Sequence, residues 1–331
     1  MSKNIKNIPC NICGSVDCRL LFKVKDLNYR TTDEEFNIVK CRGCGLVYVN
    51  PQPKEMGRYY PPAYGPHSPD PKVSIKEPLR KTLELFYNYR AAGKADAAGI
   101  TDKLRYLPRF FEIKLKDDFF FFRIPYGEDK RILDVGCGNG SYLLRLKKLG
   151  WNANQLYGVD LPGENLKRLR EAEGINITEG DFLNAPLPPD FFDFVTLNHV
   201  LEHFGDPLAA MKKAYKIVKP GGKVLIGIPN FKSVEALFIF KEKWYHLDPP
   251  RHLYHFAPKT LKRLLNCAGF AVEKLYLKKS PAPFALGLKN YGYHVSKSTE
   301  KYVISNMLKL FKLFGFSGEL LCIAVKKAGS K

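Results

Sequence analysis

The stretch Ile132-Leu133-Asp134-Val135-Gly136-Cys137-Gly138-Asn139-Gly140 decides the fold. An apolar run that ends in alternating glycines and continues as Ser-Tyr-Leu-Leu predicts a strand, a tight turn and then a helix. Glycine suits this turn because the backbone bends sharply there, and a β-carbon would keep a ligand away from the backbone N–H groups. A dinucleotide-binding fingerprint requires a further glycine at position 141, where Ser141 stands.

Two acidic residues at later strand ends extend this pattern. Asp160 follows Gly140 by twenty residues, in Tyr-Gly-Val-Asp, where a carboxylate can accept both hydroxyls of a ribose. Asp181 follows the third predicted strand, in position to accept from an adenine amino group, with Phe182 against the ring. A single GxGxG run is often an ordinary tight turn. The GxGxG run, Asp160 and Asp181 at three successive strand ends together favour S-adenosylmethionine as the bound cofactor.

Strands and helices alternate from residue 130 onward, which predicts an α/β fold with a parallel sheet covered on both faces. The sequence divides into a four-cysteine zinc ribbon (1–52), a proline-rich linker with a helical cap or lid (53–128) and a catalytic domain (129–331). Seven prolines between 51 and 74 exclude regular helix and central strand. Apolar periodicity predicts helices over 75–124, and the run Phe119–Phe122 should be buried. The predicted strands are 131–135, 156–160, 175–179, 192–197, 223–228, 271–277 and 319–326, with helices over 141–149, 164–173, 207–218 and 258–267 and a turn at Pro220-Gly221-Gly222.

Four cysteines form two CxxC pairs, each followed by glycine, in CNICG and CRGCG. The pairs are separated by 27 residues, a spacing typical of a tetrahedral zinc site. Four thiolates leave no open position, so the ion should be structural; its predicted ligands are Cys10, Cys13, Cys41 and Cys44. Cys18 is expected to be a spare thiol.

The stretch 130–280 resembles the Rossmann-like class I methyltransferases, including the small-molecule enzymes of the ubiquinone pathway. The matching segments are ILDVGCGNG, GVDL, EGDF, FDFVTLNHVLEH and KPGGKVLIGIPN. The resemblance implies a seven-stranded sheet of order 3-2-1-4-5-7-6 with its last strand antiparallel. It also implies that the segment after strand four, here Asn198 and His199, lies along the methionyl end of the cofactor. The predicted cofactor-binding residues are Asp134, Gly136, Cys137, Gly138, Gly140, Asp160, Leu161, Asp181, Phe182, Asn198 and His199.

The leader CRGCGLVYVNPQP resembles the zinc-binding leader of methyltransferases from sugar and cell-envelope polysaccharide pathways. Related deoxysugar C-methyltransferases carry a further C-terminal domain, for which this chain is too short. O-methylation is therefore favoured and N-methylation stays open. The expected acceptor is a sugar, a nucleotide-linked sugar or a polysaccharide precursor, which a phosphate group would make complementary to the positive charge.

Five of the seven histidines lie in two loops that follow predicted strands, the edge where doubly wound sheets bind ligands. In the sugar methyltransferases that the chain resembles, a histidine in each loop reaches the acceptor, and by motif these are His203 and His252. His252 is predicted as general base or substrate orienter. The alternative is that both loops are structural and their histidines satisfy backbone carbonyls. Asp248-Pro249-Pro250 resembles an amino-methylation signature but stands after the wrong strand.

The net charge of +20 attracts polyanions, although a lysine-rich surface can also have no partner. Two other functions therefore stay open: an RNA methyltransferase that grips phosphates with its leader, and a non-catalytic scaffold with this fold. The segment 301–314 is amphipathic, with Ile304, Leu308, Phe311 and Phe314 on one face, and can pack on the domain or rest on a membrane surface. The N-terminal residues carry no apolar signal region, so a cytoplasmic location is expected.

Overall fold

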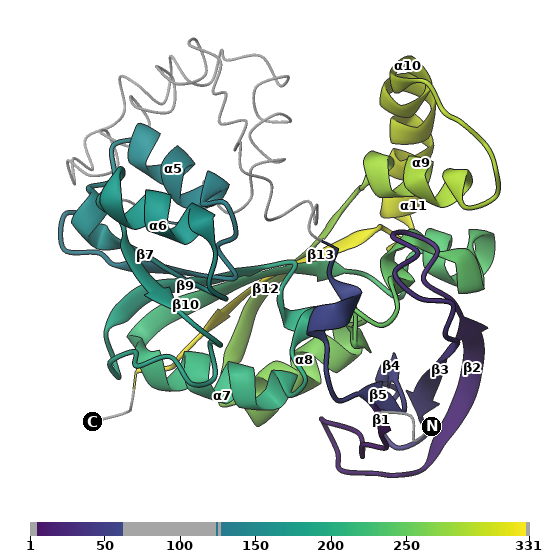
Figure 1. Ribbon diagram of the computed structural model, residues 1–331, viewed down its shortest axis with the longest axis horizontal. Coiled ribbons are helices and arrows are strands. Elements are labelled where there is room, and N and C mark those ends of the chain that lie inside the picture. The colour runs from purple at the N-terminus through teal and green to yellow at the C-terminus, as the bar shows by residue number, and fades with distance from the viewer. Residues whose placement is uncertain (1–4, 62–123, 125–126, 329–331) are drawn as a thin grey trace. The chain divides into compact units, whose positions relative to one another are not determined.

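The computed structural model describes residues 5–61, 124 and 127–328 (Figure 1). It divides into two compact units. The first comprises Met1–Tyr64, Leu197–Lys216 and Ile226–Lys331, and the second comprises Gly65–Thr196 and Ile217–Leu225. The helices predicted over 75–124 and the apolar run Phe119–Phe122 lie, apart from Ile124, outside the described residues.

A seven-stranded sheet has the strand order β12-β13-β10-β9-β6-β7-β8. Counted along the chain, this is the order 3-2-1-4-5-7-6 that the resemblance to class I methyltransferases implies. Strands β6 to β8 pair in parallel, and β13 runs antiparallel to β12. The strands are β6 (Ile132–Val135), β7 (Leu156–Asp160), β8 (Asn176–Glu179), β9 (Phe192–Asn198), β10 (Val218–Pro229), β12 (Ala271–Lys278) and β13 (Glu319–Val325). The fold is therefore the α/β fold of Rossmann-like methyltransferases.

Helices flank these strands because their apolar residues recur on one face. In the second unit, α5 (Ser141–Lys148) buries Leu143 and Leu146, and α6 (Glu164–Glu171) buries Leu166 and Leu169. Figure 1 shows α5 and α6 beside β7, and α5 contacts that strand. In the first unit lie α7 (Pro207–Ile217, whose last residue belongs to the second unit) and α8 (Pro258–Cys267).

One predicted turn is wrong. Pro220-Gly221-Gly222 lies inside β10, which runs unbroken from Val218 to Pro229. Gly221 has a φ of +78°, so the chain bends there without leaving the strand. A β-carbon on Gly222 would lie 3.0 Å from the carbonyl oxygen of Asp193, so glycine lets β10 run close against the backbone of β9.

The cysteine-rich leader forms its own small sheets, drawn in purple in Figure 1. Strands β2 (Cys18–Val24), β3 (Phe36–Cys41) and β4 (Val47–Val49) belong to a four-stranded sheet of order β11-β4-β3-β2. The fourth strand, β11 (Tyr254–His255), comes from the histidine-rich loop far along the chain and pairs Tyr254 with Tyr48. A second, two-stranded sheet joins β1 (Ile5–Lys6) to β5 (Gln52–Pro53).

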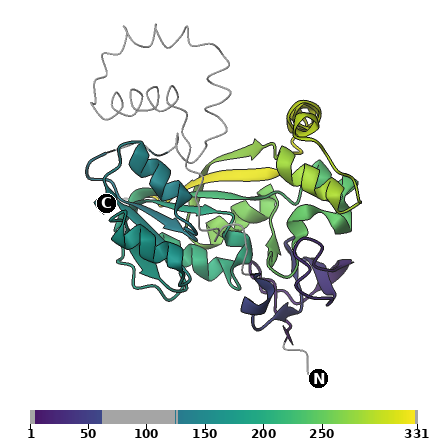
Figure 2. The same ribbon diagram turned by 45° about the horizontal axis from the view of Figure 1, so that its top comes forward.

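Near the C-terminus, α9 (Pro281–Lys289), α10 (Lys297–Thr299), the π-helical turn η8 (Glu300–Ile304) and α11 (Ser305–Leu313) pack together. Figure 2 shows this group of helices in yellow-green. Ile304 and Leu308 are buried as predicted, but Phe314 is 70% exposed, because the helix ends at Leu313 and leaves that ring beyond the packed face. Within the described ranges, no helix has the length and apolar character of a membrane span.

The remaining helical segments are short turns, which connect the longer elements. They are η1 (Gly57–Tyr59), η3 (Ala153–Gln155), η4 (Leu201–His203), η5 (Glu235–Ile239), η6 (Lys241–Lys243) and η7 (Tyr245–Leu247).

Candidate functional site

The glycine loop after β6 has the backbone shape that the sequence predicts. Gly136, Gly138 and Gly140 have φ values of +67°, +55° and +77°, in the left-handed region that favours glycine. Behind the loop, Cys137 is buried, and a β-carbon built on Gly158 would lie 2.8 Å from its sulfur. Burial raises the pKa of the Cys137 thiol well above its usual value, so the side chain is a neutral part of the core.

The third glycine serves packing as much as ligand access. A β-carbon on Gly140 would lie 2.3 Å from Cδ2 of Leu169, so glycine at this position lets the start of α5 approach α6. Next to it, the Asn139 side-chain oxygen accepts hydrogen bonds from both the N–H and the hydroxyl of Ser141, at 3.2 and 2.6 Å. These bonds fix the point where the loop becomes helix.

Asp134, just before the loop, is 5% exposed, and its Oδ1 accepts a hydrogen bond of 2.6 Å from the Thr196 hydroxyl. Burial raises the pKa of Asp134 to about 7, with a smaller contribution from the negative charge of Asp160. A cationic ligand above the loop would favour the ionised form of this carboxyl group.

Asp160 also contacts the glycine loop. Its Oδ2 accepts a 2.6 Å hydrogen bond from the Gly138 N–H, and its Oδ1 accepts one of 2.7 Å from the Leu161 N–H. Each carboxylate oxygen can accept a further bond, so the side chain can still receive the two hydroxyls of a ribose. Leu161 is 62% exposed, which leaves its side chain accessible to a ring placed beside the loop.

After β8, the Asp181 carboxylate accepts from the Leu183 N–H at 3.1 Å and from the Asn184 side chain at 3.2 Å. Asp181 itself is exposed, whereas Phe182 is buried. The Phe182 ring is thus a wall of the core at this strand end and does not project into solvent. Asp134, the glycines, Asp160 and Asp181 all belong to the second unit.

Asn198 and His199 belong to the first unit, at the end of β9. His199 has a φ of +54°, which is rare for a residue with a side chain, and its N–H donates to the Gly227 carbonyl at 2.8 Å. Its Nδ1 lies 3.4 Å from Oε1 of Glu202. This carboxylate raises the pKa of His199 against the opposing effect of burial.

The structure brings His203 and His252 together. Their rings meet edge to face with centroids 4.6 Å apart. Nδ1 of His203 lies 3.0 Å from the Arg251 carbonyl oxygen and 3.2 Å from the Tyr60 hydroxyl, and Nδ1 of His252 lies 2.8 Å from the carbonyl oxygen of His246. Burial, together with the neighbouring His252, lowers the pKa of His203 to about 4, so this ring is neutral at neutral pH.

Sequence reasoning missed Glu202 as a member of this group. Its side chain is 1% exposed, and atoms of Glu202, His203 and His252 that can bind a metal lie within 4.8 Å of one another. Burial opposes ionisation of Glu202, but the adjacent His199 imidazole outweighs it and lowers the pKa of Glu202 to about 2. The carboxylate is therefore ionised. The sequence signal that could have identified Glu202 is its position beside His203 in Leu-Glu-His.

Sequence reasoning also missed Arg251, which is completely buried. Its guanidinium group binds Asp26 at 2.5 and 3.0 Å, Asp248 at 2.7 and 3.0 Å, and the Tyr59 carbonyl at 2.9 Å. Asp26 comes from the leader and Tyr59 from the segment that follows it, so Arg251, the residue before His252, ties the leader to the histidine loop. The Asp-Pro-Pro-Arg motif thus has a structural role, consistent with its rejection as a catalytic signature.

The four cysteines of the leader converge, with all four sulfur atoms within 4.8 Å of one another. Cys10 pairs with Cys44 at 3.3 Å and Cys13 with Cys41 at 3.5 Å. In each CxxCG motif the glycine adopts a positive φ, +71° at Gly14 and +81° at Gly45, and donates its N–H back to the first cysteine's carbonyl. Tetrahedral zinc needs sulfur atoms about 3.8 Å apart, so this donor set fits the ion. Cys18, across from Cys41 in the β2–β3 register, is outside the cluster.

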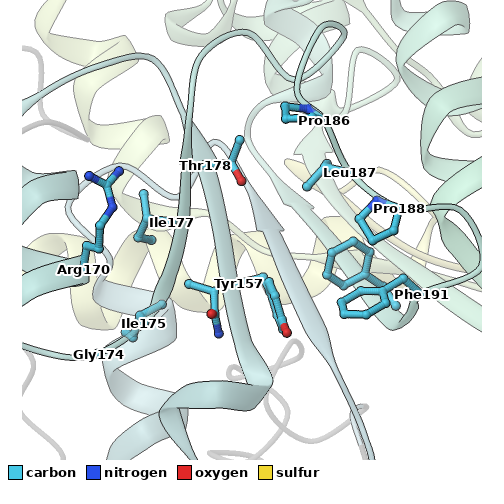
Figure 3. Close-up of a pocket in the computed structure, with 12 residues that line it drawn as sticks. Tyr157, Arg170, Gly174, Ile175, Ile177, Thr178, Pro186, Leu187, Pro188 and Phe191 are labelled. Carbon is cyan, nitrogen blue, oxygen red and sulfur yellow. The ribbon is translucent and has the colours of Figure 1, made fainter.

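A pocket of about 460 Å³ lies in the second unit, along β8 and the segment 186–192 (Figure 3). Tyr157 and Phe191 line it, and Arg170 at its side forms an ion pair with Glu179 at 2.7 Å. None of the residues predicted to bind the cofactor lines this pocket. It is therefore distinct from the glycine loop.

Comparison with known proteins supports the class that the fold and the loop define. Residues 104–275 match the family described as a methyltransferase domain, which covers half of the chain. The chain belongs to this methyltransferase-domain family.

Among curated proteins, the demethylmenaquinone methyltransferase of Geobacillus sp. (strain WCH70) is 30% identical over 109 residues, 31% of this chain and 47% of that protein. The chain thus spans about half the length of this relative. The enzyme of the same name from Staphylococcus saprophyticus is 29% identical over 170 residues, 44% of this chain and 72% of that protein.

Solved structures include a SAM-dependent methyltransferase from Archaeoglobus fulgidus, with a TM-score of 0.42 and 24% identity over 69% of this chain and 98% of that one. One from Mesorhizobium loti has a TM-score of 0.41 and 20% identity over 60% of this chain and 92% of that one.

Proposed function

We propose that the protein is an S-adenosylmethionine-dependent methyltransferase that methylates a small-molecule acceptor. The observation that carries this proposal is the pairing of the glycine loop with Asp160, whose carboxylate lies against the loop at adjacent strand ends. Backbone N–H groups at such a turn and a carboxylate at the next strand end are the parts that hold an adenosine. When bound, the cofactor supplies an electrophilic methyl group, and Asp134, Asp160 and Asp181 would hold its polar atoms.

On the acceptor side, we propose that His203 and His252 receive the group to be methylated. Methyl transfer from a sulfonium ion is an in-line displacement, so alignment of the acceptor supplies much of the rate. A hydroxyl acceptor must also lose its proton, and a positioned base contributes about 10²- to 10⁴-fold. Both imidazoles are held by backbone carbonyls, with His252 buried and His203 half-buried, and this fixed orientation suits them to both tasks.

For the acceptor itself, we propose a sugar, a nucleotide-linked sugar or a polysaccharide precursor, with O-methylation favoured. Support comes from the leader, whose sequence resembles that of sugar methyltransferases and whose sheet includes β11, two residues after His252. A phosphorylated acceptor would also be complementary to the net charge of +20.

A second candidate acceptor is a lipid-soluble quinone, since the relatives at about 30% identity are named demethylmenaquinone methyltransferases. The observation that favours it is an apolar surface on the C-terminal helices. Large exposed apolar side chains and exposed lysines occur along these helices, and we propose that this surface rests on an anionic membrane. Its apolar residues are Leu286, Tyr291, Tyr293, Tyr302, Val303, Leu310, Leu313 and Phe314, and its lysines are Lys297, Lys301, Lys309 and Lys312.

Two measurements separate the acceptors. Radiolabelled S-adenosylmethionine is incubated with the protein and either a panel of nucleotide sugars or a demethylated quinone in detergent; label in one class of product identifies the acceptor. Flotation with vesicles containing anionic lipid tests the surface. The double variant Leu313→Ser/Phe314→Ser should lose vesicle binding, whereas Val16→Ser, at an equally exposed apolar position in the leader, should retain it. Equal binding by both would remove the membrane proposal.

Cofactor binding is tested by calorimetry with S-adenosylhomocysteine. Asp160→Ala should weaken binding by about 2 to 4 kcal/mol, roughly 30- to 1000-fold, because hydrogen bonds to a charged group are worth about 1.5–3 kcal/mol each. Asp129→Ala removes a carboxylate that is 79% exposed and should leave the affinity unchanged. No binding by the wild type, or no difference between Asp160→Ala and wild type, would refute the assignment.

For the leader we propose one structural zinc ion, held by Cys10, Cys13, Cys41 and Cys44. A closed set of four thiolates stabilises a fold and offers no position for substrate. The ion would therefore act on catalysis only through the strands that it holds in place.

A further inference from the structure

We infer that Glu202, His203 and His252 form a second metal site, which binds a divalent transition-metal ion. The inference rests on the proposed function, because an ion here would bind the acceptor. It differs from the leader's cysteine site in its donors, two imidazoles and one carboxylate, and in having only three of them.

The first argument is the mutual geometry of the three side chains. One metal-binding atom from each lies within 4.8 Å of the other two, and the two imidazole rings meet at 82°. Glu202 and His203 come from η4, and His252 from the loop before β11, so two separate segments contribute. Zinc–nitrogen and zinc–oxygen bonds of about 2.0–2.2 Å put tetrahedral ligand atoms about 3.4 Å apart, so these three side chains need only small shifts to hold one ion.

The second argument is the orientation of the rings. In each ring Nδ1 faces a backbone carbonyl, Arg251 O for His203 and His246 O for His252. A carbonyl oxygen only accepts, so Nδ1 carries the proton and donates it, and Nε2 keeps its lone pair. Histidines that bind metals are held in the same way, with the other ring nitrogen donating to a carbonyl or carboxylate.

The third argument is the lack of partners for the carboxylate. Glu202 is 1% exposed, and among the described residues neither of its oxygens has a hydrogen-bond partner that meets normal geometry. The nearby His199 Nδ1 lies 3.4 Å from Oε1, too far for a strong hydrogen bond. Nε2 of His246, whose ring stacks on His252, is also buried and has no hydrogen-bond partner in the described part of the chain. Buried polar atoms without partners are destabilising, and a cluster of them indicates an absent ion or ligand.

Three protein ligands leave coordination positions open, as in catalytic rather than structural metal sites. The open positions would take an oxygen of the acceptor, and His203 and His252 would then act on the acceptor through the ion. Imidazole with carboxylate suits zinc and iron among divalent ions, whereas four thiolates select zinc. The acceptor implied is one that presents a hydroxyl group to a metal.

The test counts metal ions on the full chain. The protein is purified under reducing conditions, its cysteine site is saturated with Zn²⁺, and binding of further Zn²⁺ is measured by calorimetry and elemental analysis. We expect a second ion per chain in the wild type, and its loss in Glu202→Gln and in His252→Ala. Glu202→Gln keeps the shape of the side chain but removes the charge, so its fold should be preserved.

The matched control is His255→Ala, which removes a buried histidine that is outside the three-residue group. It should retain the second ion. The proposal is overturned if the wild type binds no second ion, or if Glu202→Gln and His252→Ala bind as many ions as the wild type. Loss of the ion in His255→Ala to the same extent would also overturn it. S-adenosylhomocysteine binding is measured on the same samples, so its presence without a second ion refutes the metal site and leaves the proposed function standing.

Discussion

The buried Arg251 allows a quantitative test of how the leader is attached to the histidine loop. Its guanidinium group is 0% exposed and lies between the carboxylates of Asp26 and Asp248, with the Tyr29 ring 4.5 Å from its central carbon. Two substitutions break the group in different ways. Asp26→Asn removes one carboxylate and leaves the arginine paired with Asp248, whereas Arg251→Met removes the cation and leaves two carboxylates facing each other.

The expected costs follow from what each change leaves unpaired. Asp26→Asn keeps one acceptor oxygen and loses part of a charged hydrogen-bond pair, which costs about 2 kcal/mol. Arg251→Met leaves Asp26 and Asp248 with side chains 0% and 7% exposed and no cation between them. Removing one partner of a buried ion pair costs about 3–5 kcal/mol, and the repulsion between the carboxylates places this variant at the upper end. A total stability of about 5–15 kcal/mol makes either change easy to measure.

The assay is urea unfolding followed by tryptophan fluorescence. The chain has two tryptophans, Trp151 in the second unit and Trp244 in the first, so a Trp151→Phe background reports on the unit that contains Arg251. Arg42→Met, which breaks the exposed ion pair with Asp17 in the same unit, is the control and should cost about 0.5 kcal/mol or less. Costs below about 1 kcal/mol for both Arg251→Met and Asp26→Asn, or a larger cost for Asp26→Asn, would refute the reasoning.

Three further predictions concern the loop, its buried carboxyl group and the leader. Gly140→Ala should lower the free energy of unfolding by about 2–5 kcal/mol, because its φ of +77° disfavours a β-carbon and that carbon would overlap Leu169. The control Gly150→Ala, at a φ of +100° with no atom within 4 Å, should lower it by only about 1–2 kcal/mol. Equal losses in the two variants would contradict the overlap. Because burial raises the pKa of Asp134 to about 7, the folded protein holds a proton that the unfolded chain releases near pH 4. The free energy of unfolding should therefore fall as pH rises from about 4 to 7, by up to about 1.4 kcal/mol per pH unit. Asp134→Asn should flatten this slope in urea titrations between pH 5 and 8. Metal analysis should find one zinc in the leader, and a chelator should lower the urea midpoint reported by Trp244 fluorescence; an unchanged midpoint after complete zinc removal would show that the ion does not support this unit.

The sheet could be predicted from the sequence because each strand end carries its own local signal. Leu156–Asp160 and Pro258–Cys267 have the predicted bounds, since a short apolar run before Asp160 and a proline before the apolar face of the helix mark them clearly. The turn at Pro220-Gly221-Gly222 was wrong, because proline and glycine also occur where one strand must run close against another, and that approach depends on Asp193 in a different segment.

The candidate site could be predicted only where one motif contains its residues. The CxxCG pairs converge as expected, because each pair is a local turn with a glycine of positive φ. By contrast, the partners of Arg251 are 192 and 225 residues away in the chain, and no periodicity connects them. Glu202 was visible in its motif, but the proposal that it binds a metal depends on its burial without hydrogen-bond partners among the described residues, which is a property of the folded chain.

The residues proposed for the methyl donor and for the acceptor belong to different units of the chain. The residues expected around the adenosine, from Asp134 to Asp181, lie at the ends of strands β6 to β8 and belong to one unit. His252 is flanked by residues that contact the leader. Tyr254 and His255, which follow it, complete the leader's sheet, and Arg251, which precedes it, binds the leader's Asp26. The leader therefore holds the loop of His252, and if the proposed role of the histidines is right, a change in the leader should alter acceptor use more than cofactor affinity. A Cys41→Ser variant that retains S-adenosylhomocysteine affinity while methyl transfer falls would support this division, and equal losses of both would contradict it.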